Sequence, residues 1–162
     1  MHIFQTLAFA TLFIGVAACS SHKTTVSADG NTVTTDDGDK SVTIKTKDGT
    51  ETIGKDAVDL SKLGVPVYPN AEKNEGGFSM SGTGAGGGGQ MVALSTTDAF
   101  DKVYDWYTSQ VPKDAEKMKV RQGNEEMAEF TIGNGAGNNA GTTITISGKS
   151  DKTEILIMKA GK

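Results

Sequence analysis

The sequence has very few of the residues that most catalytic and metal sites require. Its 162 residues include one cysteine, Cys19, and two histidines, His2 and His22. Because no histidine or cysteine follows position 22, the rest of the chain lacks the residues for Ser-His-Asp and Cys-His catalysis and for the usual zinc and copper sites. A single cysteine also excludes a disulfide within the chain. We therefore expect a protein that is not an enzyme and that carries no cofactor.

The sequence also lacks a strong excess of either charge. The chain has 16 Lys and Arg residues against 20 Asp and Glu residues, which gives a formal net charge of −4. A mildly acidic chain with interspersed charges offers no basic patch for nucleic acid and no polybasic stripe for anionic lipids. Aromatic residues make up only 6% of the chain, whereas 21 residues are glycine. This composition predicts one domain with polar loops or a tail, and no nucleic acid partner.

Long hydrophobic runs are absent except at the start of the chain. An uncharged stretch extends from Ile3 to Ala18 and contains three polar residues. A membrane-spanning helix needs about 20 predominantly apolar residues, so this stretch is short for a transmembrane anchor. A short apolar segment that ends in small residues is typical of a cleaved signal peptide. We expect residues 1–18 to be such a signal.

The end of this segment, Val16-Ala17-Ala18-Cys19, resembles the lipobox of bacterial lipoproteins. The resemblance implies cleavage between Ala18 and Cys19, a diacylglycerol on the Cys19 thiol and acylation of the new amine. It also implies a bacterial envelope protein held to the lipid bilayer through Cys19. In enterobacterial lipoproteins a Ser such as Ser20 after the cysteine accompanies sorting to the outer membrane, facing the periplasm. A plain cleaved signal is the alternative, because no Lys or Arg precedes the apolar stretch.

After a short tether at residues 19–23, three Asp-Gly dipeptides punctuate a polar segment at 29–30, 37–38 and 48–49. Asp-Gly favours two-residue hairpin turns, so the spacing predicts a small β-meander over residues 24–56, separate from the following domain. A flexible segment is the alternative. The cluster Asp36-Asp37-Gly38-Asp39 does not match a calcium loop, because Val42 stands where the template needs glycine. The predicted turns place the following residues opposite each other: Val26 and Val33, Val33 and Val42, Ile44 and Ile53.

Residues 57–71, AVDLSKLGVPVYPNA, contain Pro66 and Pro69 and predict an extended strap leading into a domain over residues 72–162. The run LGVPVYPNA resembles a recurring segment of uncharacterised bacterial envelope lipoproteins. This resemblance implies an envelope location and one compact domain, and it implies no activity. The nearby Gly82-x-Gly84-x-x-Gly87 has the letters of a dinucleotide motif but is followed by a predicted strand at 90–95, so we expect a hairpin loop.

One amphipathic helix is predicted over residues 98–111, with Thr96 or Thr97 as its cap and Pro112 at its end. Further strands are predicted at 117–121, 125–132, 142–148 and 153–159, with 155–158 in the centre of the sheet. The expected fold is α+β: a predominantly antiparallel sheet of five or six strands with one helix packed on a face. The helical spacing indicates this buried face: Phe100, Val103, Tyr104, Tyr107 and Val111.

Candidate binding residues are few. Trp106 lies near the edge of the helical stripe and is a candidate for contact with a glycan or peptide. Asn134, Asn138 and Asn139 lie in a glycine-rich loop at 133–141 and are candidates for contact with a ligand. We expect a lipid-anchored, non-catalytic envelope protein that contacts another envelope protein or the cell wall. A small-molecule site near the glycine-rich loops is the alternative, and an enzyme without His or Cys chemistry is the third.

Overall fold

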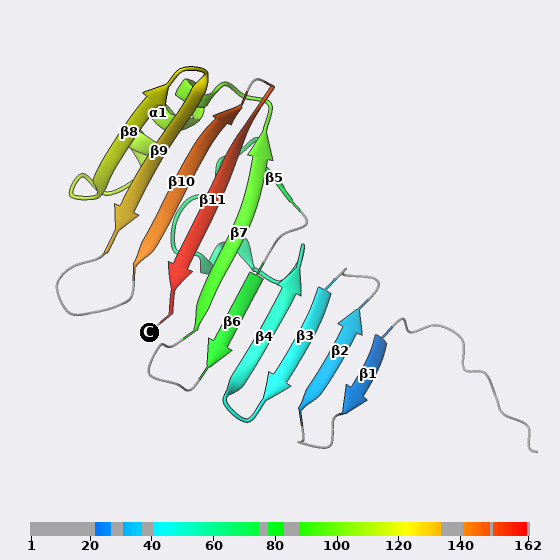
Figure 1. The fold of residues 1–162 in the computed structure, drawn as a ribbon. Coiled ribbons are helices and arrows are strands. Elements are labelled where there is room, and N and C mark those ends of the chain that lie inside the picture. The colour runs from blue at the N-terminus through cyan, green and yellow to red at the C-terminus, as the bar shows by residue number, and fades with distance from the viewer. Residues whose placement is uncertain are drawn as a thin grey trace, which may run out of the picture.

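The computed structural model describes residues 22–26, 31–36, 41–74, 78–82, 88–133, 141–149 and 151–161. The fold is α+β, as predicted, and consists of one antiparallel sheet with an α-helix on one of its faces. Figure 1 shows α1 behind the sheet, on the same side as the connection between β4 and β5. In these ranges no helix is long and apolar enough to cross a membrane.

The sheet has eleven strands among the described residues, in the spatial order β1-β2-β3-β4-β6-β7-β11-β10-β9-β8, with β5 pairing to β7. The elements are β1 (His22–Val26), β2 (Thr32–Asp36), β3 (Ser41–Thr46), β4 (Gly49–Gly54), the 3-10 helix η1 (Leu60–Lys62), β5 (Glu72–Lys73), β6 (Phe78–Gly82), β7 (Gly89–Thr96), α1 (Phe100–Gln110), β8 (Glu116–Gln122), β9 (Glu125–Ile132), β10 (Thr142–Lys149) and β11 (Lys152–Ala160). The predicted helix and the predicted strands after residue 89 are therefore confirmed. The interior position of β11, between β7 and β10, is confirmed as well.

The core lies between α1 and alternate residues of the central strands, on what we call the core face of the sheet. Period-2 alternation gives β7, β9, β10 and β11 one buried face each, because successive side chains point to opposite sides. The buried strand residues are Val92, Leu94, Ala128, Phe130, Ile144, Ile146, Ile155 and Ile157. From α1 and the residue after it come Phe100, Val103, Tyr107 and Val111, as predicted, whereas Tyr104 is half-buried.

Residues 57–71 form the predicted strap, which also packs on the core face. Val58, Leu63 and Tyr68 are buried there, and each contributes about 1.5–3 kcal/mol of hydrophobic stabilisation. The strap contains one helical element, the single turn η1. Asp59 caps this turn, because its Oδ1 accepts a hydrogen bond from the Ser61 backbone N–H at 3.0 Å.

The predicted register of the meander is wrong at each of its three pairings. Val26 pairs with Thr32, one residue away from the predicted Val33. The other two pairings differ by two residues, since Val33 lies opposite Ile44 and Val42 lies opposite Ile53. A two-residue shift keeps apolar residues on their common face, whereas the one-residue shift takes β1 out of that pattern.

The reason is that the strand pairings do not fit a two-residue turn centred on each Asp-Gly dipeptide: Val26 pairs with Thr32, Asp36 with Ser41 and Thr46 with Gly49. The connections β1–β2 and β2–β3 run over residues 27–31 and 37–40, and loops of that length do not set the register as tightly. The third turn is centred on Lys47-Asp48, with Thr46 paired to Gly49. The Thr46 hydroxyl accepts a hydrogen bond from the Asp48 backbone N–H at 3.2 Å, which favours this turn over one at Asp48-Gly49.

The meander is also part of the main sheet rather than a separate element. β4 pairs with β6, in a register that sets Ile53 opposite Phe78, and β6 pairs with β7. A continuous ladder thus connects β1 to β8 (Figure 1). The pairing of β4 with β6 thus stabilises the meander, and α1 does not cover it.

The predicted threonine cap of the helix is wrong. The residue before the first turn of α1 is Ala99, which makes no capping hydrogen bond through its side chain. The Thr96 hydroxyl accepts instead from the backbone N–H of Asp98, at 3.2 Å. Because the backbone carbonyl of Asp98 accepts a 2.7 Å bond from the Thr153 hydroxyl, this corner is fixed to β11 rather than to a local cap.

Candidate functional site

The most distinctive surface of the molecule is the face of the sheet opposite the core face, which we call the open face. Six large hydrophobic side chains are exposed in the described part of the chain, each by 37–45%. The strand registers place all of them on the open face. They are Val33, Ile53, Met118, Val120, Met127 and Met158.

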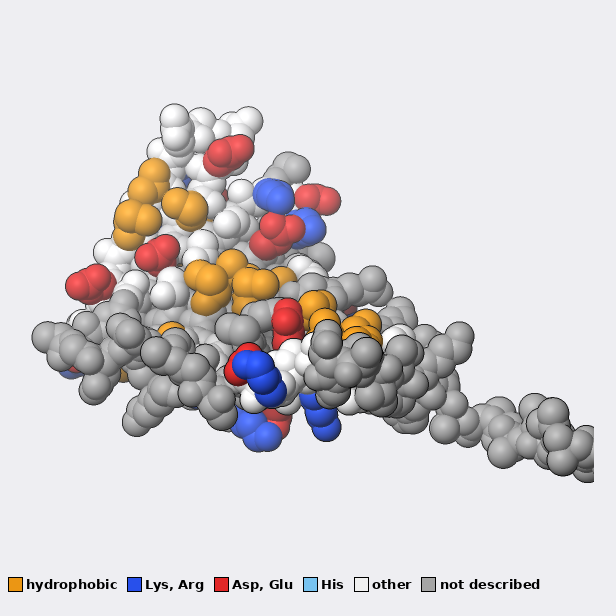
Figure 2. Space-filling view, turned by 60° about the horizontal axis from the view of Figure 1, so that its bottom comes forward, with side chains coloured by type: hydrophobic (Ala, Val, Ile, Leu, Met, Phe, Trp, Pro, Cys, Tyr) orange, Lys and Arg blue, Asp and Glu red, His pale blue; other side chains and the backbone are white. Residues whose placement is uncertain are grey.

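The open-face hydrophobic side chains that the structure describes form three groups, and β6, which lies between the first and the second, has Phe78 and Met80 at open-face register positions. The first group comes from β2, β3 and β4: Val33, Val42, Ile44 and Ile53. The second comes from β7 and β11: Met91, Leu156 and Met158. The third comes from β8 and β9: Met118, Val120 and Met127. Thr143 and Thr145 of β10 separate the second group from the third. The facing strands of neighbouring groups are two strand intervals apart, or about 10 Å at the usual spacing of about 4.8 Å. Figure 2 shows acidic side chains among the hydrophobic ones.

The charged groups of the open face are mostly carboxylates. By register this face carries six glutamates: Glu51, Glu72, Glu116, Glu125, Glu129 and Glu154. Among the strand residues that the structure describes, three lysines stand at open-face register positions: Lys23, Lys149 and Lys152. Lys149 and Lys152 both bind Glu154, at 3.0 and 2.8 Å. These hydrogen bonds, first from Lys152 and then from Lys149, lower the pKa of Glu154. Within the described residues the other five glutamates form no ion pair.

Two of the three cations of β8, Lys119 and Arg121, are in contrast paired with acids on the core face. Lys119 donates to Asp101 of α1 at 2.7 Å, and its ammonium lies 4.1 Å from the centre of the Tyr104 ring. Arg121 contacts Asp101 at 3.3 Å and also bonds to Glu126. The hydrogen bond from Lys119 is the main cause of the lowered pKa of Asp101. The two faces therefore differ: the core face pairs Lys119 and Arg121 with acids, and the open face presents five glutamates that form no ion pair within the described residues.

Trp106 lies on the core-face side of the sheet, away from the open face. The side chain is half-buried and packs against the core. Its ring makes edge contacts with Tyr68 and Tyr107, at centroid distances of 5.3 and 4.8 Å. Two aromatic neighbours give Trp106 a packing role, and its role in binding a glycan or peptide stays a prediction.

The remaining candidate residues lie outside the described residues. They are the lipidation and cleavage residues Cys19 and Ala18 and the loop residues Asn134, Asn138 and Asn139. Groups of three or more His, Cys, Asp and Glu side chains that suit a metal ion do not occur in the part of the chain that the structure describes.

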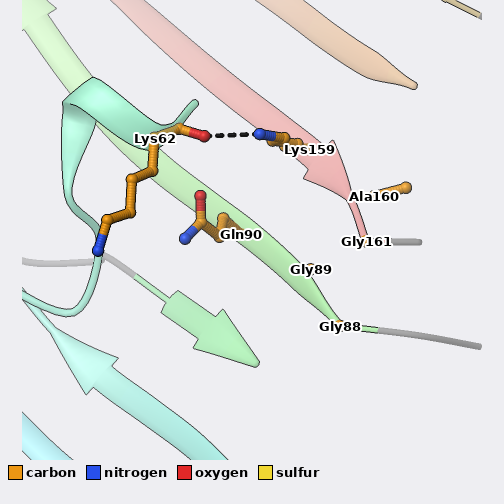
Figure 3. Close-up of a pocket in the computed structure, with 7 residues that line it drawn as sticks. All are labelled: Lys62, Gly88, Gly89, Gln90, Lys159, Ala160 and Gly161. Atoms are coloured by element: carbon orange, nitrogen blue, oxygen red, sulfur yellow. Dashed lines mark hydrogen bonds between the residues drawn. The ribbon is translucent and has the colours of Figure 1, made fainter. Parts of the chain in front are cut away.

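A cavity of about 260 Å³ lies where β7 and β11 meet, at the end of the first glycine-rich loop. Figure 3 shows its lining residues: Lys62, Gly88, Gly89, Gln90, Lys159, Ala160 and Gly161. The Lys159 ammonium donates to the Lys62 carbonyl at 2.6 Å, which closes one side of the cavity. The Gln90 Oε1 atom is buried and has no hydrogen-bond partner among the described residues. An unpaired buried acceptor of this kind suits a small ligand that donates a hydrogen bond.

Sequence reasoning missed the open face, although the pattern contained it. Met127 and Glu129 alternate with the buried Ala128 and Phe130, and Met118 and Val120 occupy alternate positions of β8. Because those alternations were interpreted as one buried and one wet face, the methionines and valines on the wet face were not considered as a surface. No family model, curated protein or solved structure matches this chain.

Proposed function

We propose that this chain is a lipid-anchored protein of the bacterial envelope, held in the outer membrane through Cys19 and facing the periplasm, and that it acts by binding rather than by catalysis. The observation that carries the binding role is the open face, with its six exposed large hydrophobic side chains. Scattered exposed hydrophobics are normal, but their concentration on one face, rimmed by polar residues, marks interaction sites.

The sequence around Cys19 supports the anchored part of the proposal. The residues Val16-Ala17-Ala18-Cys19 resemble a lipobox, and two residues separate Cys19 from β1. So short a connection spans at most about 10 Å. An acyl chain on Cys19 would hold the β1 edge of the sheet close to the bilayer, and the open face would extend outward from it.

The test of the anchor is fractionation of cells that express the full chain. We expect the wild-type protein to stay in the membrane fraction and to require detergent for extraction, because two or more acyl chains hold a protein firmly. Cys19→Ser should leave the protein unprocessed or release it from the membrane. Ser20→Ala is the matched control and should behave as the wild type. Wild-type protein that is wholly soluble in the periplasm would contradict the proposal.

A second function, binding of a small molecule, is favoured by the cavity at Gly88–Gln90. Gln90 lines the cavity, and its Oε1 atom has no hydrogen-bond partner among the described residues. A ligand at a hundred times its Kd stabilises a protein by about 2.7 kcal/mol. Small-molecule extracts of the envelope should then raise the thermal midpoint of the wild type and leave Gln90→Leu unchanged. No shift in either protein would remove this candidate.

A further inference from the structure

We propose that the open face binds a protein partner whose contact surface is elongated and carries aliphatic side chains interspersed with Lys and Arg. This inference rests on the proposed binding function and names the partner by its chemistry. It comes from three properties of the open face: the exposed hydrophobic groups, the sign of the charges among them and the length over which they extend.

The charges of the open face determine which charges the contact surface of the partner carries. Five glutamates on the open face form no ion pair within the described residues, since Lys149 and Lys152 bind Glu154 instead: Glu51, Glu72, Glu116, Glu125 and Glu129. Glu129 lies opposite Met118, and Glu51 lies opposite Ile44, so carboxylates stand directly beside two of the hydrophobic groups. A partner that covers those groups also approaches the carboxylates. Lys or Arg at those points gives complementary charge, whereas an acidic surface is repelled.

The same charges disfavour the other occupants of an apolar face. Two open faces packed against each other would bring glutamates against glutamates, which is costly. An anionic lipid surface or an anionic wall polymer meets the same repulsion, because six glutamates stand against three lysines at the described strand positions of the open face, and two of those lysines bind Glu154. A protein with a cationic and aliphatic surface satisfies both the hydrophobic groups and the carboxylates.

The spacing of the groups determines the shape of the partner. From β2 to β8 the sheet crosses eight strand intervals, which is about 40 Å at the usual spacing. The hydrophobic groups lie near the two ends and the middle of this distance. The partner therefore needs an extended contact surface rather than a single side chain that fills one pocket. An amphipathic helix or a row of loops that lies across the strands would reach all three groups.

The test uses photo-crosslinking in living cells, with the full chain and a photoreactive amino acid at one position at a time. Met118 and Met158 are the test positions, since both are exposed on the open face. Asp105, exposed on α1 at the other side of the sheet, is the control position. We expect a protein adduct from both test positions and none from Asp105. The cross-linked peptide of the partner, identified by mass spectrometry, should contain Lys or Arg beside aliphatic residues.

Charge reversal then separates this partner from any protein that merely collides with the face. The double variant Glu51→Lys, Glu129→Lys should reduce the yield of the Met118 adduct about tenfold or more, because it places like charges against the partner. The control double variant Asp105→Lys, Asp114→Lys changes the net charge equally and should leave the yield unchanged. Circular dichroism and the thermal midpoint of each purified variant check that the fold is kept.

Several outcomes would overturn the inference: an adduct at twice the mass of the chain, adducts with lipid alone, no adduct, or equal yields in the two double variants. These outcomes can be distinguished from a result that contradicts lipid anchoring through Cys19. A wild-type chain found in the soluble fraction would contradict lipidation, and the cross-linking result for the open face would still be read from that soluble chain.

Discussion

Tyr107 combines a ring that stabilises the core with a hydroxyl that does not. The side chain is fully buried, and its ring centroid lies 4.8 Å from that of Trp106 and 6.1 Å from that of Phe130. The hydroxyl makes no hydrogen bond of good geometry within the described residues, although it lies near the backbone of Tyr68. Burial raises the pKa of Tyr107 to about 12, against a smaller lowering by the Tyr68 backbone. A buried hydroxyl without a partner costs free energy, so the ring alone accounts for the stabilisation.

Substitution of Tyr107 should therefore separate the two contributions. Tyr107→Phe should leave the free energy of unfolding unchanged or raise it by about 1–2 kcal/mol, because it removes the unpaired hydroxyl. Tyr107→Ala should lower it by about 3–5 kcal/mol, as for other buried aromatic truncations. Trp106→Ala should cost less, since Trp106 is only half-buried. Urea denaturation measures all three, and a Phe variant as unstable as the Ala variant would contradict the assignment.

Asp98 fixes the start of α1 to the strap. Its carboxylate accepts hydrogen bonds from Tyr68 at 2.7 Å, from Asn70 at 3.0 Å and from Lys102 at 2.9 Å. These bonds, with that from Asn70 the largest contribution, lower the pKa of Asp98 from 3.8 to about 2. The lowered pKa means that the folded state favours the ionised form.

The pH dependence of stability follows from this direction. A carboxylate with a lower pKa in the folded state contributes its stabilisation above its unfolded pKa and loses it as the pH falls through the folded pKa. For Asp98 that window extends from 3.8 down to about 2. Asp98→Asn should therefore flatten the loss of stability over this window, as measured by urea midpoints at several pH values. A variant with the same pH dependence as the wild type would contradict the role of Asp98.

Among the elements, those with a long periodic pattern were predictable from sequence and those set by turns were not. The residues of α1 repeat at three and four positions, and β9 to β11 alternate over eight or nine residues, so their faces followed directly. The β1 to β4 register depended on the Asp-Gly turns. The bond from the Asp48 backbone N–H to the Thr46 hydroxyl moved the third turn by one residue, a competition between local bonds that a dipeptide preference does not resolve.

The register of the β3–β4 hairpin can be tested with pairs of cysteines. Thr43 and Thr52 lie opposite each other, with their hydroxyl oxygens 3.2 Å apart, so Thr43→Cys with Thr52→Cys should form a disulfide readily. Thr43→Cys with Gly54→Cys corresponds to the register expected from an Asp48-Gly49 turn and should not. Mass spectrometry of the oxidised Cys19→Ser chain distinguishes them, and a disulfide in the second pair alone would support the other register.

At the scale of the whole molecule, the buried core and the open face have different extents. Every buried hydrophobic residue in the described part of the chain lies between Val58 and Ile157, whereas the open face extends over β2, β3 and β4 as well. The first four strands therefore add surface to the molecule but no core. The strap residues Val58 and Leu63, by contrast, belong to the core although they precede the main strands.

This distribution predicts which truncations fold. A chain that begins at Ala57 should keep its near-ultraviolet circular dichroism and a cooperative thermal transition, because it retains the whole core. A chain that begins at Val65 is the matched comparison and should be less stable, since it lacks Val58 and Leu63, each worth about 1.5–3 kcal/mol when buried. A chain from Ala57 that does not fold would mean that β4 is needed to protect the edge of β6.

The candidate site was predictable only in part, because a sequence without tertiary structure does not reveal which exposed positions meet. The segment around Cys19 is local and could be interpreted directly. The open face combines residues as distant in sequence as Val33 and Met158, which share one face of the sheet only because β4 pairs with β6. That pairing was not predicted, and the surface that depends on it was missed for the same reason.

The central claim, that this is a lipid-anchored protein, is tested most directly by the mass of its mature N-terminus. The chain should be purified with detergent from the membrane fraction of expressing cells, and its N-terminal peptide analysed by mass spectrometry. The account predicts a peptide that begins at Cys19 and carries the mass of a diacylglyceryl group on sulfur and an acyl group on the amine. A peptide that begins at any other residue, or one that begins at Cys19 with a free thiol, would contradict it.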